Sequence, residues 1–217
     1  MTIDEGKTDM ICCCIALLIA AQGSLTDTLW TENTEYYSIS VNYPARALEN
    51  EAVGETLEEF ASEKIQNFKD SFKEYFKDDP FLMEWNLEIT FIHEPSPDGM
   101  LCITARIWDY SGGAHGNSWT QAFVFDLATD SLIGPVELLG SQEEFETFAE
   151  EVMVQLNELH VDEGWVERGA SPTPENYHTL FPVPDENGDI AGYTVIFPPY
   201  QVDCYACGPS EVYVPVE

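Results

Sequence analysis

The sequence WNLEITFIHEPSPDGMLCITARIW, residues 85–108, predicts the central element of this protein. Apolar side chains alternate with polar ones on both sides of a Pro97-Asp98-Gly99 turn, which is the pattern of two half-buried strands joined as a hairpin. The alternating apolar residues are Leu87, Ile89 and Phe91 before the turn, and Leu101, Ile103, Ala105 and Ile107 after it. We expect this hairpin to place one apolar face against another element.

The element that fits this face precedes the hairpin. Residues 51–77 carry apolar side chains at steps of three and four with Glu and Lys between them, which predicts a long amphipathic helix that ends before Pro80. A further strand, Tyr36 to Tyr43, stops at Pro44. The helix positions are Val53, Leu57, Phe60, Ala61, Ile65, Phe68, Phe72 and Phe76.

The second half of the chain repeats this mixture of strands and one helix. Strands are predicted at 122–125, 193–197 and 212–216, and a turn at 126–130 leads from the first of them into residues 131–136. Ser141 with Glu144 three residues later is a capping-box signature, so a second helix should start there, and Gly164 should mark its end. The segment Arg168 to Glu175 should be an exposed connection.

Strands and single helices without regular βαβ alternation indicate an α+β fold. We expect a mainly antiparallel sheet with two long amphipathic helices, arranged as two sub-domains that meet near residues 95–100. The 44% hydrophobic and 12% aromatic content excludes a disordered chain.

The N-terminus has the layout of a signal peptide or short membrane anchor, residues 1–23. An apolar run from Met10 to Ala21 precedes the small residues Ala21 and Gly23, and it is shorter than the about 20 residues that a spanning helix needs. No firm membrane span is therefore expected, and the mature protein should be exported to the periplasm or the extracellular space, free or membrane-associated. A buried core helix is the alternative reading of the run.

The charge balance limits the partners. The chain has 8 Lys plus Arg against 40 Asp plus Glu, a formal net charge of −32, and Arg168 is the only basic side chain after Arg106. Such a field repels phosphate backbones and anionic membrane surfaces, so nucleic acid is excluded as a partner. It would attract a cationic partner, or it would serve only to keep an exported protein soluble.

Two stretches are the most specific motifs. The first is the loop Gly112, Gly113, Ala114, His115, Gly116, Asn117, and the second runs from Phe197 through Tyr200, Cys204, Tyr205 and Cys207 to Pro215. In this order they resemble the family of RsiV-type C-terminal domains, often preceded by a PdaC-type module. The resemblance implies a PdaC-type module at 30–97 and an RsiV-type domain at 98–217.

What the resemblance implies is a binding module of the bacterial cell envelope rather than an enzyme. RsiV captures lysozyme and inhibits it by binding, so the implied role is a lysozyme-binding sensor or inhibitor, with a cationic extracellular protein such as lysozyme as the partner. The candidate binding residues are Gly112, Gly113, His115, Gly116, Asn117, Tyr200 and Tyr205. The alternative is an envelope hydrolase or accessory domain that acts on peptidoglycan.

Three cysteines lie outside the apolar run: Cys102, Cys204 and Cys207. In an exported protein the C-x-x-C pair favours a Cys204–Cys207 disulfide, with Cys102 as a buried thiol. Redox activity or half of a zinc site are the alternatives, but no second C-x-x-C or spaced His pair completes a tetrahedral site. We therefore expect no metal and no cofactor.

The sequence contains few candidate catalytic residues. Asp109 and His115 are close enough in sequence for an acid–imidazole pair, with Ser111 as a nucleophile, but nothing in their spacing makes them converge. Residues 185–189 (DENGD) are similar to a calcium loop that lacks the glutamate expected at the twelfth position. Weak surface binding of calcium there stays open.

Overall fold

The computed structural model describes residues 27–76, 84–159 and 163–216. The apolar run of residues 10–21, and with it the predicted signal peptide, lies outside these ranges. Among the helices of the described residues, none combines the length and the apolar character needed to cross a bilayer.

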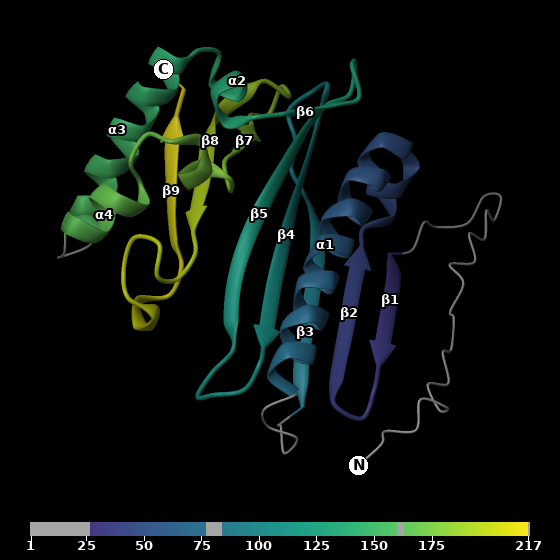
Figure 1. Cartoon of the computed structure of the whole chain (residues 1–217). Helices are drawn as coiled ribbons and strands as arrows, with labels where there is room; N and C mark the ends of the chain where they lie inside the picture. Colours follow the sequence, from purple (N-terminus) through teal and green to yellow (C-terminus); the bar gives the residue numbers. More distant parts are fainter. Residues whose placement is uncertain (1–26, 77–83, 160–162, 217) are drawn as a thin grey trace.

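The first half of the chain builds a six-stranded sheet in the order β1-β2-β3-β4-β5-β6 (Figure 1). Every neighbouring pair is antiparallel except β2 and β3, which run parallel because α1 (Glu51–Phe76) connects them as a crossover. The strands are β1 (Thr28–Asn33), β2 (Tyr37–Tyr43), β3 (Trp85–Glu94), β4 (Met100–Tyr110), β5 (Asn117–Asp126) and β6 (Ser131–Ile133).

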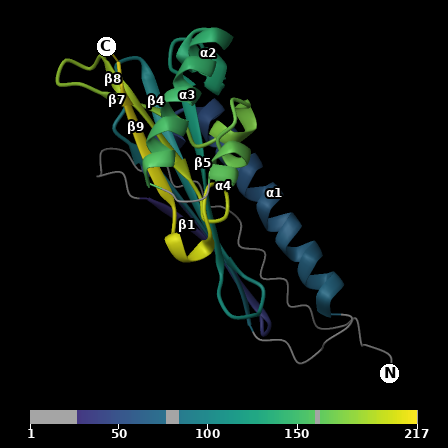
Figure 2. The ribbon, with the colours of Figure 1, turned by 90° about the vertical axis from the view of Figure 1, so that its left-hand side faces the viewer.

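Helix α1 covers one face of this sheet (Figures 1 and 2). A short 3-10 helix, η1 (Ala45–Glu49), leads into it, and the side chain of Asn50 accepts hydrogen bonds from the backbone N–H groups of Ala52 and Val53 at 3.0 and 3.3 Å. This satisfies donors that a helix start leaves unpaired. The buried side chains between α1 and the sheet form the first core, which includes Leu57, Ile89 and Ile103.

The second half forms a three-stranded antiparallel sheet, β7-β8-β9, with helices packed against it. The sequence-predicted N-cap is present, since the Glu144 backbone N–H donates to Ser141 Oγ, whereas the Glu144 carboxylate accepts from the Ser141 hydroxyl and not from its backbone N–H as a full capping box requires. The elements are α2 (Pro135–Leu139), α3 (Gln142–Leu159), α4 (Glu163–Gly169), η2 (Pro174–Tyr177), β7 (Phe181–Pro184), β8 (Ile190–Phe197), η3 (Tyr205–Cys207) and β9 (Ser210–Pro215).

The second core lies between α3 and this sheet and extends onto the far face of the first sheet. Cys102 of β4 and Val124 of β5 are register partners that point into it, whereas Ile103 and its partner Phe123 point into the first core. Strands β4 and β5 are thus buried on both faces and join the two cores. The predicted module boundary at 97/98 falls in the β3–β4 turn and stays a prediction.

The α+β class, the mainly antiparallel sheet and the two long helices are confirmed. Two local predictions are wrong. Gly164 does not end the second helix: α3 ends at Leu159, and Gly164 lies inside the separate helix α4. The connection 168–175 is only partly exposed, because Gly169 and Ala170 are buried where α4 meets the second core.

Candidate binding site

The β4–β5 loop turns sharply at its glycines. Gly112 and Gly113 have φ angles of 92° and 100°, which L side chains rarely adopt, and this confirms that the glycines are needed for the turn. The loop also requires a small residue at Gly116, where a Cβ would lie 2.6 Å from the indole of Trp108. The loop is therefore shaped by its backbone and packs directly on β4.

The second motif is anchored to α4 and η2. The amide of Gln201 donates to the backbone carbonyls of Gly169 and Asn176 at 2.8 and 2.9 Å, and Val202 is buried in the second core. Tyr200 has a φ of 74°, an unfavourable angle for a bulky residue, and its side chain is 52% exposed. Strain at an exposed ring that the surrounding contacts hold in place is common at binding sites.

The two motifs meet at Tyr205. Its ring stacks on His115 with centroids 4.0 Å apart and planes 17° apart, and its other neighbour is Tyr200 at 5.4 Å. The Tyr205 hydroxyl donates to the Gly116 carbonyl at 3.2 Å, and His115 Nδ1 lies 2.9 Å from the same oxygen. Because a carbonyl only accepts, His115 donates from Nδ1, and this histidine holds the loop rather than facing a carboxylate.

A second pair of rings continues this surface along β4. Trp108 and Tyr110 stack with centroids 6.4 Å apart and planes 11° apart, and Trp108 is 37% exposed. Gly116 lies between Trp108 and the His115–Tyr205 stack. We call the five rings Trp108, Tyr110, His115, Tyr200 and Tyr205 the aromatic patch.

The sequence-predicted candidates thus gather at one junction, with one exception. Asn117 starts β5 and directs its side chain to the carboxylate of Asp109. Sequence reasoning did not single out Trp108, although it is followed by Tyr110 two residues later at the end of a strand, where both side chains point to the same face.

Asp109, Ser111 and His115 do not form a catalytic arrangement. His115 stacks on Tyr205, whereas Asp109 and Ser111 line a cleft of about 390 Å³ between α1 and the sheet, together with Trp85 and Trp119. Burial raises the pKa of the Asp109 carboxyl, and the hydrogen bond from Asn117 opposes this. The cleft therefore holds a carboxyl group without an imidazole beside it.

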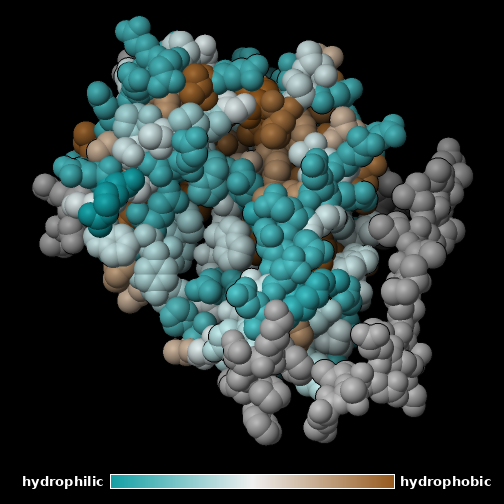
Figure 3. Space-filling view, in the orientation of Figure 1, coloured by the Kyte–Doolittle hydropathy of each residue, from teal (hydrophilic) through white to brown (hydrophobic). Residues whose placement is uncertain are grey.

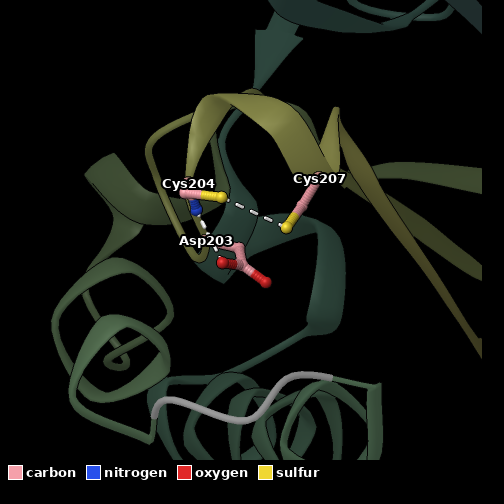
Figure 4. Close-up of side chains that lie close together, drawn as sticks. All are labelled: Asp203, Cys204 and Cys207. Atoms are coloured by element: carbon pink, nitrogen blue, oxygen red, sulfur yellow. Dashed lines mark hydrogen bonds between the residues drawn. The ribbon is translucent and has the colours of Figure 1, made fainter.

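The C-x-x-C pair acquires a third neighbour in the fold. Cys204 Sγ and Cys207 Sγ lie 3.3 Å apart, and a carboxylate oxygen of Asp203 lies within 4.8 Å of both (Figure 4). The pKa of Cys207 is raised to about 11 by Cys204 and by Asp203. The predicted disulfide stays a prediction, whereas the predicted burial of Cys102 is confirmed. In the sequence, the only indication that Asp203 belongs with the two cysteines is its position directly before Cys204.

In the 185–189 loop, the Asp185 carboxylate accepts hydrogen bonds from the backbone of the loop itself. Asp185 Oδ1 accepts from the N–H groups of Asn187 and Asp189 at 2.8 and 2.9 Å, and these bonds lower the pKa of Asp185. Such internal bonds are typical of an Asx turn between two strands. The role of these acidic residues is therefore to form the turn that connects β7 to β8.

The face of the molecule seen in Figure 3 is mostly hydrophilic, with hydrophobic residues exposed mainly near its top. Among the described residues, the recorded ion pairs all involve lysines of α1, namely Lys64, Lys69 and Lys73. Beyond β4 the only basic side chain is Arg168, which lies over the Trp165 ring at 5.7 Å. The charged side chains of the second half are consequently almost all acidic.

Comparisons with known proteins agree with this architecture. Residues 30–118 match the family model described as deacetylase PdaC. Two solved proteins of the DUF3298 family have a similar structure. The one from Bacteroides fragilis NCTC 9343 has a TM-score of 0.52 and 16% identity over 88% of this chain and 89% of that chain. The one from Pseudomonas aeruginosa PAO1 has a TM-score of 0.50 and 13% identity over 88% of each chain.

No curated protein sequence matches the chain. At these identities the structural likeness concerns the fold alone. Residues 30–118 thus match the PdaC family model, and the chain as a whole has a fold similar to that of the two DUF3298-family proteins.

Proposed function

We propose that this protein is an exported binding module of the bacterial cell envelope. PdaC-type domains are generally extracytoplasmic, and the match of residues 30–118 to that family supports this location. The apolar N-terminal run followed by small residues supports export by the secretory route. The protein would work in the periplasm or outside the cell, free or attached to the membrane.

The observation that carries the binding role is the aromatic patch. Tyr and Trp rings dominate the binding energy of protein interfaces, since they bury a large area and lose little conformational freedom. Tyr205 is fixed by stacking and by its bond to Gly116, and Tyr200 is held exposed in a strained backbone conformation. A surface of this kind is built in advance for a partner.

We propose a cationic extracellular protein as that partner, with lysozyme as the first candidate. The net charge of −32 supplies long-range attraction for a basic protein, and the patch supplies the packed contact. The choice of lysozyme rests on the resemblance of residues 98–217 to RsiV-type domains. This closer assignment is part of the proposal.

Titration calorimetry with c-type lysozyme at low and at physiological salt tests the proposal. Charge alone gives a contact that fades as salt shortens the Debye length to about 8 Å. A packed interface keeps its affinity, so we expect tight binding in both buffers and loss of lysozyme activity. An unrelated basic protein of similar charge is the control, and equal binding of both proteins would contradict the proposal.

A hydrolytic role is the second candidate, and the half-buried carboxyl of Asp109 in the cleft is the observation that favours it. An acid with a raised pKa in a cleft is a typical general acid or base. Release of products from peptidoglycan by the wild-type chain, abolished in Asp109→Asn, would support this role. Equal and negligible release by both chains would remove it.

A further inference from the structure

We propose that the reduced protein binds one zinc ion through Asp203, Cys204 and Cys207. The three ligand atoms lie within 4.8 Å of one another and come from one five-residue segment at the end of the Tyr200 loop. Figure 4 shows the three side chains close together, with the two sulfurs facing each other and one Asp203 carboxylate oxygen at the Cys204 N–H. Tyr205 of the aromatic patch lies inside this segment, but metal binding does not depend on the binding role proposed for the patch.

The ligand geometry is close to what zinc needs. With Zn–S bonds of about 2.3 Å, a tetrahedral ion separates its two sulfurs by about 3.8 Å. The two sulfurs are 3.3 Å apart, so side-chain rotations that part them by roughly 0.5 Å produce this spacing without a change of backbone. Thiolate sulfur selects zinc over magnesium and calcium, which prefer oxygen ligands.

The segment is held in place by contacts that do not involve the metal. The Cys204 N–H donates to Asp203 Oδ1 at 2.6 Å, which orients the carboxylate, and the Cys207 N–H donates to the Cys204 carbonyl at 3.1 Å. On its two sides the segment is fixed by buried Val202 and by the Tyr205–Gly116 bond. A preformed set of ligands lowers the ordering cost of binding.

Charge and exposure agree with this assignment. Two thiolates and one carboxylate place three negative charges together, and a divalent cation offsets most of them. On binding, each cysteine loses its thiol proton to solvent and forms a Zn–S bond, with no oxidation step. Cys204 and Cys207 are both exposed, so the fourth tetrahedral position is open to water.

Zinc and a Cys204–Cys207 disulfide exclude each other, because the disulfide uses both sulfurs. The test is a titration of the reduced full-length chain, with Cys12, Cys13 and Cys14 replaced by serine so that their thiols do not compete. It uses Zn²⁺ against a chromogenic chelator, and Co²⁺ followed by its sulfur-to-metal absorption in the near ultraviolet. We expect one ion per chain and no binding by the oxidised chain.

Matched variants locate the site. Cys207→Ser should abolish the cobalt–sulfur absorption, and Asp203→Asn should weaken zinc on the order of 10-fold or more. Asp185→Asn, in the acidic 185–189 loop, should bind as the wild type does. The absence of the cobalt–sulfur absorption in reduced wild type, or zinc binding that is unchanged in Cys207→Ser, would overturn the assignment.

Discussion

Both halves of the molecule pack a long helix against a sheet, but the exposed surfaces of the two helices differ in charge. In the first half α1 carries lysines among its acids, and the recorded ion pairs of the described residues involve this helix, including Lys69 with Glu32 of β1 at 2.6 Å. In the second half the covering helix α3 contains no Lys or Arg at all. Its exposed side carries six glutamates among uncharged residues, and the recorded ion pairs of the described residues include none of them.

This difference separates stability from recognition. An exposed ion pair contributes about 0–1 kcal/mol, so neither helix depends on its surface charges to stay folded. Stability must come from the buried contacts, and the uncompensated acids of the second half are free to act as a long-range field. The aromatic patch lies where the two halves meet, and it supplies the short-range contact.

The largest expected effect is on the second core. Tyr177 is fully buried, and its hydroxyl donates to the Ala170 carbonyl at 2.7 Å. Tyr177→Ala should lower the free energy of unfolding by about 3–5 kcal/mol, and Tyr177→Phe by about 1–2 kcal/mol. Lys69→Ala on α1, measured by the same chemical denaturation, should cost below about 1 kcal/mol. Equal losses for Lys69→Ala and Tyr177→Ala would break the comparison.

A second substitution targets the anchoring of the Tyr200 loop. A Cβ at Gly169 would collide with the backbone carbonyl of Gln201. Gly169→Ala should therefore push the loop away from α4 and lower the free energy of unfolding by about 1–3 kcal/mol. The Tyr205 ring should also become less ordered. Denaturation and the near-ultraviolet circular dichroism of the aromatic rings measure the two effects. Wild-type stability in this variant would show that the loop is not fixed by α4.

The disulfide has a smaller expected effect. The Cys204–Cys207 bond would close a very short loop, so its reduction should cost less than the about 3 kcal/mol of longer loops. Mass spectrometry of the exported protein without reductant, after alkylation, shows whether the bond forms. Two alkylated thiols at these positions would mean that the pair is reduced in its native location.

Tyr200→Gly should change stability and binding in opposite directions. Glycine removes the strain of the 74° φ angle, which is worth about 1 kcal/mol, so the thermal midpoint should rise, while partner affinity falls with the lost ring. Tyr213→Gly on β9, where no such angle exists, should only destabilise. A fall in stability for Tyr200→Gly would remove strain as the reason for the exposed conformation.

Most of the fold was predictable where side-chain periodicity is strong. The α1 pattern, the β3–β4 alternation and the Ser141 cap each follow from local physics. Strand β1 was missed because it is an edge strand with mostly exposed residues, and β7 because it contains two prolines. The parallel pairing of β2 with β3 depends on how α1 crosses the sheet, which no local pattern shows.

The candidate site was predictable only in part. The glycine loop and the Tyr200–Cys207 segment stand out by composition and by their resemblance to a family, but their contact through Tyr205 is a long-range packing event. The prediction that Gly164 ends the second helix was wrong. A glycine after an apolar pattern usually ends a helix, whereas here it lies in α4. The sequence does not show that Asp203 lies near both sulfurs, because this proximity depends on how the fold bends the segment.

The most direct test of the central claim is the lysozyme titration at physiological salt repeated with single ring deletions. If the aromatic patch is the binding surface, Tyr205→Ala should weaken binding by about 2 kcal/mol, roughly 30-fold in Kd. Tyr213→Ala, an exposed tyrosine outside the patch, should bind as the wild type does. Binding that survives Tyr205→Ala undiminished would contradict the account, because the contact would then lie elsewhere on the molecule.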